Sequence, residues 1–272
     1  MEIQWSLVLF TAISGAGAWL FAFIGLNEFL GRARNDKGLM VGCVLAAVLL
    51  AVGGVASVTH LSHVDHVLWV LQHPAPGIFV EALLIGIDAV LAVVFFLLVK
   101  REVSAGARKA VAVLAIAMGP IFTYSCGSSY MMASQLAWNT ITLPLGYLGT
   151  AIPAGAAIWM LVGYYFKESD EAHKVAGVEL AVAGAASLVL GAAYGFASGA
   201  AFNDQTVLFW IAVVAVGSVV PGVCGILVAR SPKLAFSAGV TAMIGGFVGS
   251  VSYRVLMWTA SVALMALFGE AI

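Results

Sequence analysis

The chain has 272 residues, of which 62% are hydrophobic and only 9% are charged, and its formal net charge is −1. Water-soluble domains contain about 25% charged residues, so the composition excludes a soluble globular domain, and we expect no nucleic-acid partner. Apolar runs recur along the whole sequence, and a run of about 20 residues crosses a hydrocarbon layer of about 30 Å. We therefore expect a single membrane domain over residues 1–272.

The apolar runs predict helices rather than the strands of a barrel. Backbone groups in lipid must be hydrogen-bonded internally, which only helices and closed barrels achieve, and these runs are continuously apolar instead of alternating. The predicted fold class is an all-α integral membrane protein with eight transmembrane helices in one bundle. The predicted spans, in chain order, are approximately 5–30, 39–60, 78–99, 110–132, 143–166, 175–200, 206–229 and 235–258.

Proline and glycine residues inside these spans predict local features. Pro120, Pro153 and Pro221 each fall inside a span and predict a kink. The pattern Gly245-x-x-x-Gly249 predicts a close contact between helices.

The positions of Lys and Arg predict how the chain lies in the membrane. Eleven of the twelve, all except Arg254, lie in the loops that follow the first, third, fifth and seventh spans. The intervening loops, near residues 61–77, 133–142 and 201–205, contain none. By the positive-inside rule the cation-rich loops are cytoplasmic. We therefore expect a protein of the bacterial cytoplasmic (inner) membrane with both termini extracytoplasmic.

The stretch "THLSHVDHVLWVLQHP", residues 59–74, contains four of the five histidines. It is predicted to form an extracytoplasmic loop, with His60 at the outer end of the second span. Three histidines spaced as His60, His63 and His66 rarely converge on one zinc ion, and no other span contains a histidine that could complete a haem site. The cysteines lie singly in apolar runs: Cys43, Cys126 and Cys224. We therefore expect no metal site and no bound cofactor in this chain.

Ionisable groups within spans indicate function, because they are costly in lipid. Glu81 lies near the outer end of the third span, and Asp88 follows seven residues later, on the same face and about 10 Å deeper. Arg254 lies near the outer end of the last span, and Tyr130 ends the polar stretch "TYSCGSSY" in the fourth. With His60, these residues predict a polar cavity in the outer half of the bilayer. Its His and Glu could accept the two protons that a quinol releases on oxidation.

Simpler interpretations exist for each of these groups. His60 could be an interfacial hydrogen-bonder, and Glu81 could complement a helix dipole. Arg254 could pair with a carboxylate or extend to lipid headgroups. Glu179, one turn inside the cytoplasmic end of the sixth span, could pair with Lys174.

Several motifs, in order along nearly the whole chain, carry a family resemblance. They are "ASVTHL" before Glu81, "AWNTITLPLGYL" at residues 137–148 and "RVLMW" at residues 254–258. With eight spans and this topology, the chain resembles the membrane-anchor subunits of dimethyl sulfoxide reductase, the DmsC family. The chain also departs from the family pattern: Ser250 replaces a glutamate four residues before the arginine, Ser128 replaces an arginine, and His66 and His73 lie where an arginine is common.

The resemblance implies a haem-free anchor in a three-subunit oxidoreductase. The implied partners are an iron–sulfur subunit with four ferredoxin-like clusters and a catalytic subunit with molybdopterin. The implied substrate is menaquinol, oxidised on the extracytoplasmic side in anaerobic respiration, with its electrons passing to the iron–sulfur subunit. His60 and Glu81 fall on the family's quinol-binding positions, and Asp88, Tyr130 and Arg254 are further candidates for the pocket.

Two alternatives remain open from the sequence. One is a proton-coupled transporter that uses Asp88 and Glu81, although such folds often show internal repeats and none is convincing here. The other is a purely structural anchor whose partner supplies its own electron acceptor.

Overall fold

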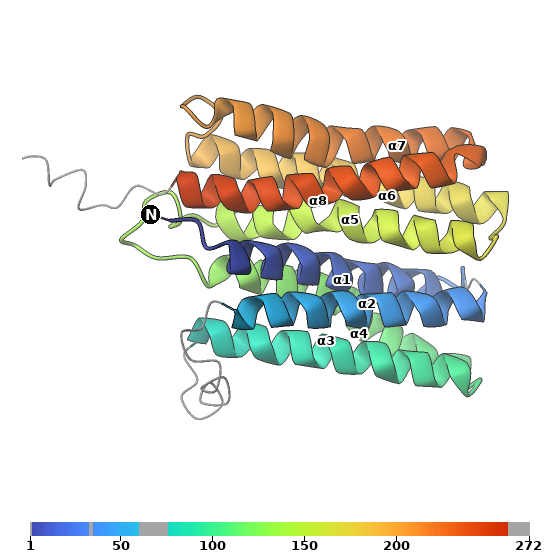
Figure 1. Cartoon of the computed structure of the whole chain (residues 1–272). Coiled ribbons are helices and arrows are strands. Elements are labelled where there is room, and N and C mark those ends of the chain that lie inside the picture. Colours follow the sequence, from blue (N-terminus) through green and yellow to red (C-terminus); the bar gives the residue numbers. More distant parts are fainter. Residues whose placement is uncertain (1, 33–34, 60–75, 261–272) are drawn as a thin grey trace, which may run out of the picture.

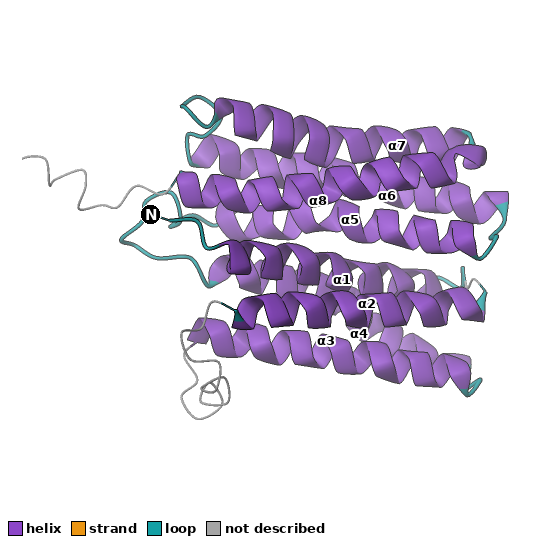
Figure 2. Ribbon diagram, in the orientation of Figure 1, coloured by secondary structure: helices purple, strands orange, loops and turns teal. Residues whose placement is uncertain are grey.

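A computed structural model describes residues 2–32, 35–59 and 76–260. Within those ranges every regular element is a helix (Figure 2), and eight spans are long and apolar enough to cross a membrane (Figure 1). The predicted all-α class and the number of spans are therefore confirmed. The spans are α1 (Trp5–Phe29), α2 (Asp36–Val58), α3 (Pro76–Lys100), α4 (Ala105–Ser128), α5 (Thr142–Tyr165), α6 (Asp170–Ala197), η2 with α7 (Leu208–Val219 and Val220–Arg230) and, after the short η3 (Pro232–Leu234), α8 (Ala235–Thr259).

Three helices begin earlier than predicted. They start at Asp36, Ala105 and Asp170, three to five residues before the expected positions. The first turn of α6 shows the reason, because the Ser169 side chain accepts a hydrogen bond from the Ala172 N–H and caps the helix. The spans are predicted from apolar runs, which mark the part of a helix inside the hydrocarbon layer. A polar first turn lies outside that run and is therefore not included in the predicted span.

The predicted end of the fourth span at residue 132 is wrong. Helix α4 ends at Ser128, so Tyr130 lies in the following loop and not within the span. The last turn contains Gly127 and Ser128, which are weaker helix formers than most. A Cβ on Gly127 would lie 2.4 Å from the Pro144 Cα, so α5 approaches the end of α4 closely. This contact holds the chain where it leaves the helix.

The helices form two four-helix units, α1–α4 and α5–α8, which lie side by side (Figure 1). In each unit every helix packs on the one before it and the one after it, and the last packs on the first. Helices α1 and α5 contact each other and are the most buried spans. The seam between the two units is therefore built mainly on α1 and α5.

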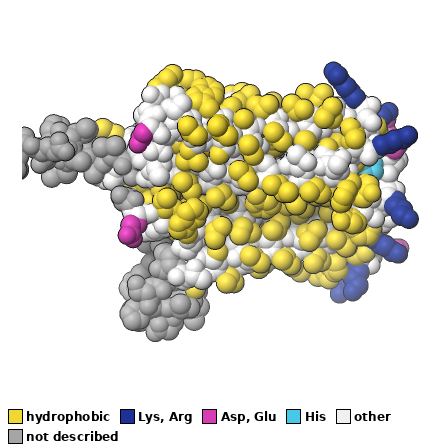
Figure 3. All heavy atoms as spheres, turned by 45° about the horizontal axis from the view of Figure 1, so that its top comes forward, with side chains coloured by type: hydrophobic (Ala, Val, Ile, Leu, Met, Phe, Trp, Pro, Cys, Tyr) yellow, Lys and Arg dark blue, Asp and Glu magenta, His cyan; other side chains and the backbone are white. Residues whose placement is uncertain are grey.

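The two ends of the bundle differ in charge. Every described Lys and Arg except Arg254 lies in or next to the α1–α2, α3–α4, α5–α6 and α7–α8 connections. These connections gather at one end of the molecule, the cation-rich end (Figure 3). The opposite, cation-poor end carries the described parts of the other connections. The charge separation matches the sequence prediction, and the location of the termini relative to the membrane stays a prediction.

The seventh span is π-helical over η2, where the backbone bonds reach five residues back. The Val220 N–H, for example, donates to the Ala215 carbonyl. Pro221 has no N–H, and the chain becomes α-helical around it, so a wide turn lies next to this proline. The kink expected at Pro221 stays a prediction. A Cβ on Gly249 would lie 2.2 Å from the Gly217 Cα of η2. The close contact predicted for Gly249 is thus made by α8 with η2.

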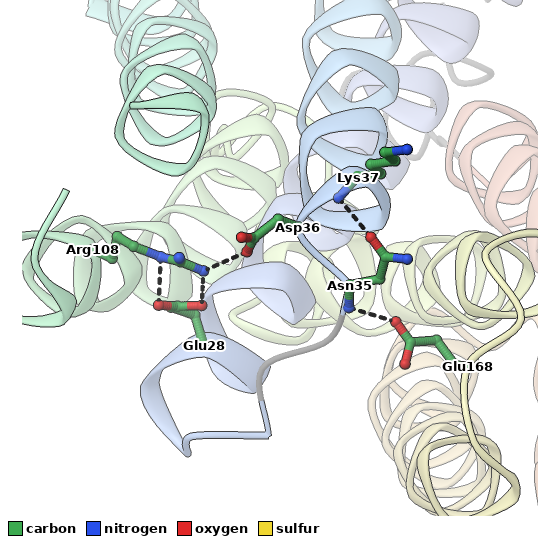
Figure 4. A network of polar contacts seen from close by, with 6 residues as sticks. All are labelled: Glu28, Asn35, Asp36, Lys37, Arg108 and Glu168. Atoms are coloured by element: carbon green, nitrogen blue, oxygen red, sulfur yellow. Dashed lines mark hydrogen bonds and ion pairs between the residues drawn. The ribbon is translucent and has the colours of Figure 1, made fainter. Parts of the chain in front are cut away.

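A polar network joins helix ends at the cation-rich end (Figure 4). Arg108 of α4 pairs with Glu28 of α1, with Nε to Oε1 at 2.8 Å and Nη2 to Oε2 at 2.9 Å. The same Nη2 lies 3.3 Å from Oδ1 of Asp36, the first residue of α2. Across the seam, the Asn35 N–H donates to Glu168 Oε1 at 2.8 Å. These contacts tie three helices of the first unit together and connect them to the second.

Glu179 makes a second contact across the seam. Asn27 Nδ2 of α1 donates to Glu179 Oε1 at 2.9 Å, and Arg32 Nη1 lies 3.9 Å from the same oxygen. The partner suggested by the sequence, Lys174, instead pairs with Glu171 at 3.3 Å. Residues three apart share a helix face and residues five apart do not, which explains why Lys174 turns toward Glu171.

The Glu28–Arg108 pair gives a test of the fold. Glu28 is 5% exposed, so Glu28→Gln leaves the Arg108 charge poorly compensated in a site nearly closed to water. Removing one partner of a buried pair costs about 3–5 kcal/mol, and we expect about 2–4 kcal/mol here because Asp36 remains nearby. Thermal unfolding of the purified protein in detergent measures the loss. Glu171→Gln, which breaks an exposed pair, is the control, and we expect less than about 1 kcal/mol. Equal losses would contradict the assignment.

Candidate functional site

Glu81 lies in the second turn of α3, with 9% of its surface exposed. The Ser129 hydroxyl, just beyond α4, donates to Glu81 Oε1 at 2.5 Å. Gly77 lets the first turn of α3 approach this loop, because a Cβ there would lie 3.1 Å from the Ser129 Cβ. Glu81 is therefore held by a neutral donor at the cation-poor end, and its second carboxylate oxygen is not needed for that contact.

Arg254 of α8 is fully buried at the same end. Its Nε and Nη2 donate to the Thr11 hydroxyl at 2.6 Å and to the Thr11 carbonyl at 3.1 Å. Nη1 donates to the carbonyl and hydroxyl oxygens of Ser250 at 2.8 and 2.7 Å. The guanidinium also lies 4.5 Å from the centre of the Tyr147 ring of α5. Helices α1, α5 and α8 thus meet on one cation.

All these partners of Arg254 are neutral. In the described part of the chain no carboxylate lies at ion-pair distance from its guanidinium. The suggestion that Arg254 pairs with a carboxylate or extends to headgroups is therefore wrong for the described residues. Ser250 stands where the family resemblance has a glutamate, and it supplies two neutral oxygens instead. Four hydrogen bonds use four of the five N–H groups of a guanidinium.

Four aromatic side chains form a cluster beside Arg254. Tyr130 stacks on Tyr147 at 5.8 Å between ring centres, and it meets the edges of Trp138 and Trp258 at 5.9 and 6.0 Å. The two tryptophan rings are 5.1 Å apart, and Trp138 Nε1 donates to the Met257 carbonyl at 2.9 Å. The loop after α4 is thereby packed onto α5 and α8.

Tyr130 is the group that connects Glu81 with Arg254. Burial raises the pKa of the Tyr130 phenol above its ordinary value, and the negative charge of Glu81 acts in the same direction. The positive charge of Arg254 acts on that pKa in the opposite direction. Tyr130 reaches both groups through its neighbours, because it follows Ser129, which bonds to Glu81, and stacks on Tyr147, whose ring Arg254 contacts. Tyr130 therefore stays a neutral hydroxyl, able to donate or accept a hydrogen bond.

Asp88 is fully buried on α3, and neither carboxyl oxygen has a hydrogen-bond partner among the described residues. It lies seven residues, or about 10 Å, further along the helix than Glu81. The structure thus brings Glu81, Tyr130 and Arg254 to one region and places Asp88 below it. Whether these residues bind a ligand stays a prediction.

His60 lies outside the described residues, as do His63, His66 and His73. Within the described ranges no three His, Cys, Asp or Glu side chains are grouped to hold a metal ion. Because the histidine stretch is not covered, the expected absence of a metal site stays a prediction.

Sequence reasoning missed several residues that build this region. Trp138, Tyr147 and Trp258 lie within quoted motifs, but nothing in the sequence assigned them a common cluster. Thr11 gave no signal, since it is a single hydroxyl in an apolar span and its partner is 243 residues away. Serine and threonine in spans often bond their own helix, which makes such long-range partners hard to anticipate.

Arg254→Lys tests the role of the guanidinium. A lysine keeps the charge but cannot donate in several fixed directions at once, so the Thr11 and Ser250 oxygens lose bonds. We expect the purified protein to lose about 2–4 kcal/mol of stability to unfolding. Arg230→Lys at the exposed end of α7 is the control, expected to change stability by less than about 0.5 kcal/mol. If Arg254→Lys unfolds like the wild type, the four-bond arrangement is not holding the helices.

Comparison with known proteins identifies a family. The family model described as DMSO reductase anchor subunit (DmsC) matches residues 1–190 of the chain. The match covers α1–α5 and most of α6, and so includes Glu81 and Tyr130 but not Arg254. No curated protein matches the chain.

Proposed function

The chain belongs to the DMSO reductase anchor subunit (DmsC) family, and from this premise we propose that it binds menaquinol at the cation-poor end and passes the electrons to a partner. Family membership makes it the membrane anchor of a DMSO reductase-like complex, associated with a molybdopterin catalytic subunit and an iron–sulfur subunit. Beyond family membership, we propose that the quinol is oxidised at this site, that it gives up two electrons, and that the reaction belongs to anaerobic respiration.

The proposed reaction releases two protons and two electrons from each menaquinol. The electrons leave to a cluster of the iron–sulfur subunit, which docks over the cation-poor end and the 61–77 loop. His60 hydrogen-bonds one quinol oxygen and takes its proton, and Glu81 accepts or relays a proton outward. No metal or haem of this chain is required for these steps.

The arrangement of Glu81, Tyr130 and Arg254 at one end carries the proposal. Ser129 occupies only Glu81 Oε1, which leaves Oε2 to take a proton. The Tyr130 phenol is the least buried group of the aromatic cluster and can donate to a quinol oxygen. Trp138, Tyr147 and Trp258 are buried against it and hold its ring in place. Arg254 places a positive charge next to this region, where it favours electron density on oxygen. Asp88 is assigned a secondary part in shaping the deeper side of the pocket.

The proposed side of the membrane follows from the cation distribution. Positive-inside placement puts the cation-rich end in the cytoplasm, so the site and both termini are extracytoplasmic, in the bacterial inner membrane. Protons released by Glu81 then leave on the outer side.

Glu81→Gln tests the proton-accepting role. The amide retains the size of the side chain and its contact with Ser129 but cannot take up a proton. We expect turnover of the purified complex with a menaquinol analogue to fall about 10²-fold, while turnover with a water-soluble reduced dye that delivers electrons directly to the partner subunits stays unchanged. Asp204→Asn, an exposed acid at the same end, is the control and should keep both activities. Unchanged quinol turnover in Glu81→Gln would remove Glu81 from the mechanism.

Buried Asp88 favours the second candidate, a proton-coupled transporter, because a carboxyl in a span without a hydrogen-bond partner among the described residues suits a proton relay. The quinol-oxidation proposal expects Asp88→Asn to slow quinol turnover by less than about tenfold and to leave the proton permeability of protein-containing vesicles unchanged. A proton flux that needs no quinol and disappears in Asp88→Asn would support the transporter instead.

The structural-anchor alternative makes a different prediction. A structural anchor with no quinone site would show no quinone in the purified complex.

A further inference from the structure

A groove with a volume of 620 Å³ lies along the seam between the two four-helix units, toward the cation-rich end. One wall is α1, with Trp19, Phe23 and Leu26, and the other is α6. Ile152 of α5 contributes between them. This seam groove is separate from the Glu81 region, which lies at the other end of the bundle.

The groove has the length of one leaflet. It extends along α6 from Glu171 to Ala186, which is 15 residues or about 22 Å. One leaflet, including its headgroup region, is about 20–22 Å thick. The groove therefore reaches from the helix ends at the cation-rich end to about the middle of the membrane.

Charge is confined to the outer half of the groove, between Glu171 and Glu179 on α6 and at Arg32. The described charged residues in its lining are Arg32, Lys174, Glu171 and Glu179, two cations and two anions. Three of these side chains are well exposed, at 49% for Arg32, 47% for Lys174 and 77% for Glu171. Arg32 is only loosely paired, at 3.9 Å from Glu179. The mouth can thus meet a negative and a positive group together.

The deep part of the groove has no available hydrogen-bond donor among its described lining side chains. Val182, Ala183, Ala186 and Ile152 are hydrocarbon, and Trp19 Nε1 already donates to the Thr123 hydroxyl at 3.3 Å. A quinone head at this depth would leave its oxygens without donors. An acyl chain has no such requirement.

We propose that the seam groove binds a zwitterionic phospholipid, with an acyl chain between α1 and α6 and the headgroup at the mouth. Arg32 and Lys174 contact the phosphate, and Glu171 contacts the ammonium group. The lipid fills the open space of the groove beside the Asn27–Glu179 contact, so it acts as a packing element between the two units.

Filling the groove with a side chain tests the site. Val182 lines the groove and is 63% exposed, whereas Val189 of the same helix is 65% exposed and is not part of the lining. Native mass spectrometry of the detergent-purified complex should find a retained phospholipid in the wild type and in Val189→Trp. We expect its occupancy to fall at least about tenfold in Val182→Trp, which corresponds to 1.4 kcal/mol.

Val178→Trp is a second variant that fills the groove, in case Val182→Trp does not fold, and we expect the same loss of phospholipid. Its melting temperature is compared with that of Val189→Trp to show that it is folded. Equal retention in all variants overturns the proposal. The proposal is also overturned if the molecule that the wild type retains and the two filling variants lose is a quinone and not a phospholipid. That result would indicate a second quinone site.

The headgroup assignment is tested by competition. The delipidated complex is mixed with equal amounts of phosphatidylethanolamine, which has an ammonium group, and phosphatidylglycerol, which has none. We expect phosphatidylethanolamine to be preferred by about threefold, and Glu171→Gln to abolish the preference. Equal binding, or a preference for phosphatidylglycerol, overturns the role given to Glu171.

Discussion

The arrangement of the helices depends on one buried cation, the guanidinium of Arg254. A charged side chain inside a membrane helix is costly, and it is tolerated only where its hydrogen bonds are made. Here Thr11 of α1 and Ser250 of α8 accept those bonds, and Tyr147 of α5 covers one face of the group. Separating α1 from α8 leaves the two N–H groups that bond to Thr11 unsatisfied in apolar surroundings. Displacing α5 removes the ring that covers the cation. The first helix of each four-helix unit is therefore fixed to α8 at the cation-poor end, which is also where the aromatic cluster forms.

Polar contacts at the other end complete the connection between the units but have a different character. Glu28 and Arg108 neutralise each other, and Glu179 bonds to Asn27 across the seam. At the cation-poor end, by contrast, Arg254 has no described carboxylate partner, and its positive charge acts on Tyr130. The paired charges at the cation-rich end stabilise the fold only, whereas Arg254 fixes helices and also keeps a positive charge that is available to polarise a ligand. This difference separates a structural end from the end where chemistry is proposed.

The sequence predicted the features that depend on composition. Hydropathy located the eight spans, and Lys and Arg located the cation-rich end, since both are properties of single residues summed over a segment. It could not predict that Tyr130 leaves the helix, because that depends on the approach of Pro144 to Gly127. It also could not predict Thr11 as a partner of Arg254, because neither residue constrains the other until the helices are packed. The sequence therefore identified the candidate residues whose charge is unfavourable inside a membrane. The neutral residues that hydrogen-bond to them were found only in the structure.

Depth within the bundle has a consequence for the proposed reaction. Arg254 lies five residues before the end of α8, and Glu81 five residues after the start of α3, so both are about 7–8 Å from the same end. Asp88 is about 18 Å from that end. A quinol bound between Glu81 and Arg254 can therefore release its protons over a short path to the cation-poor side, without passing Asp88. If the iron–sulfur subunit docks on that same side, electrons and protons leave in the same direction. Quinol oxidation by this subunit would then move no net charge across the membrane.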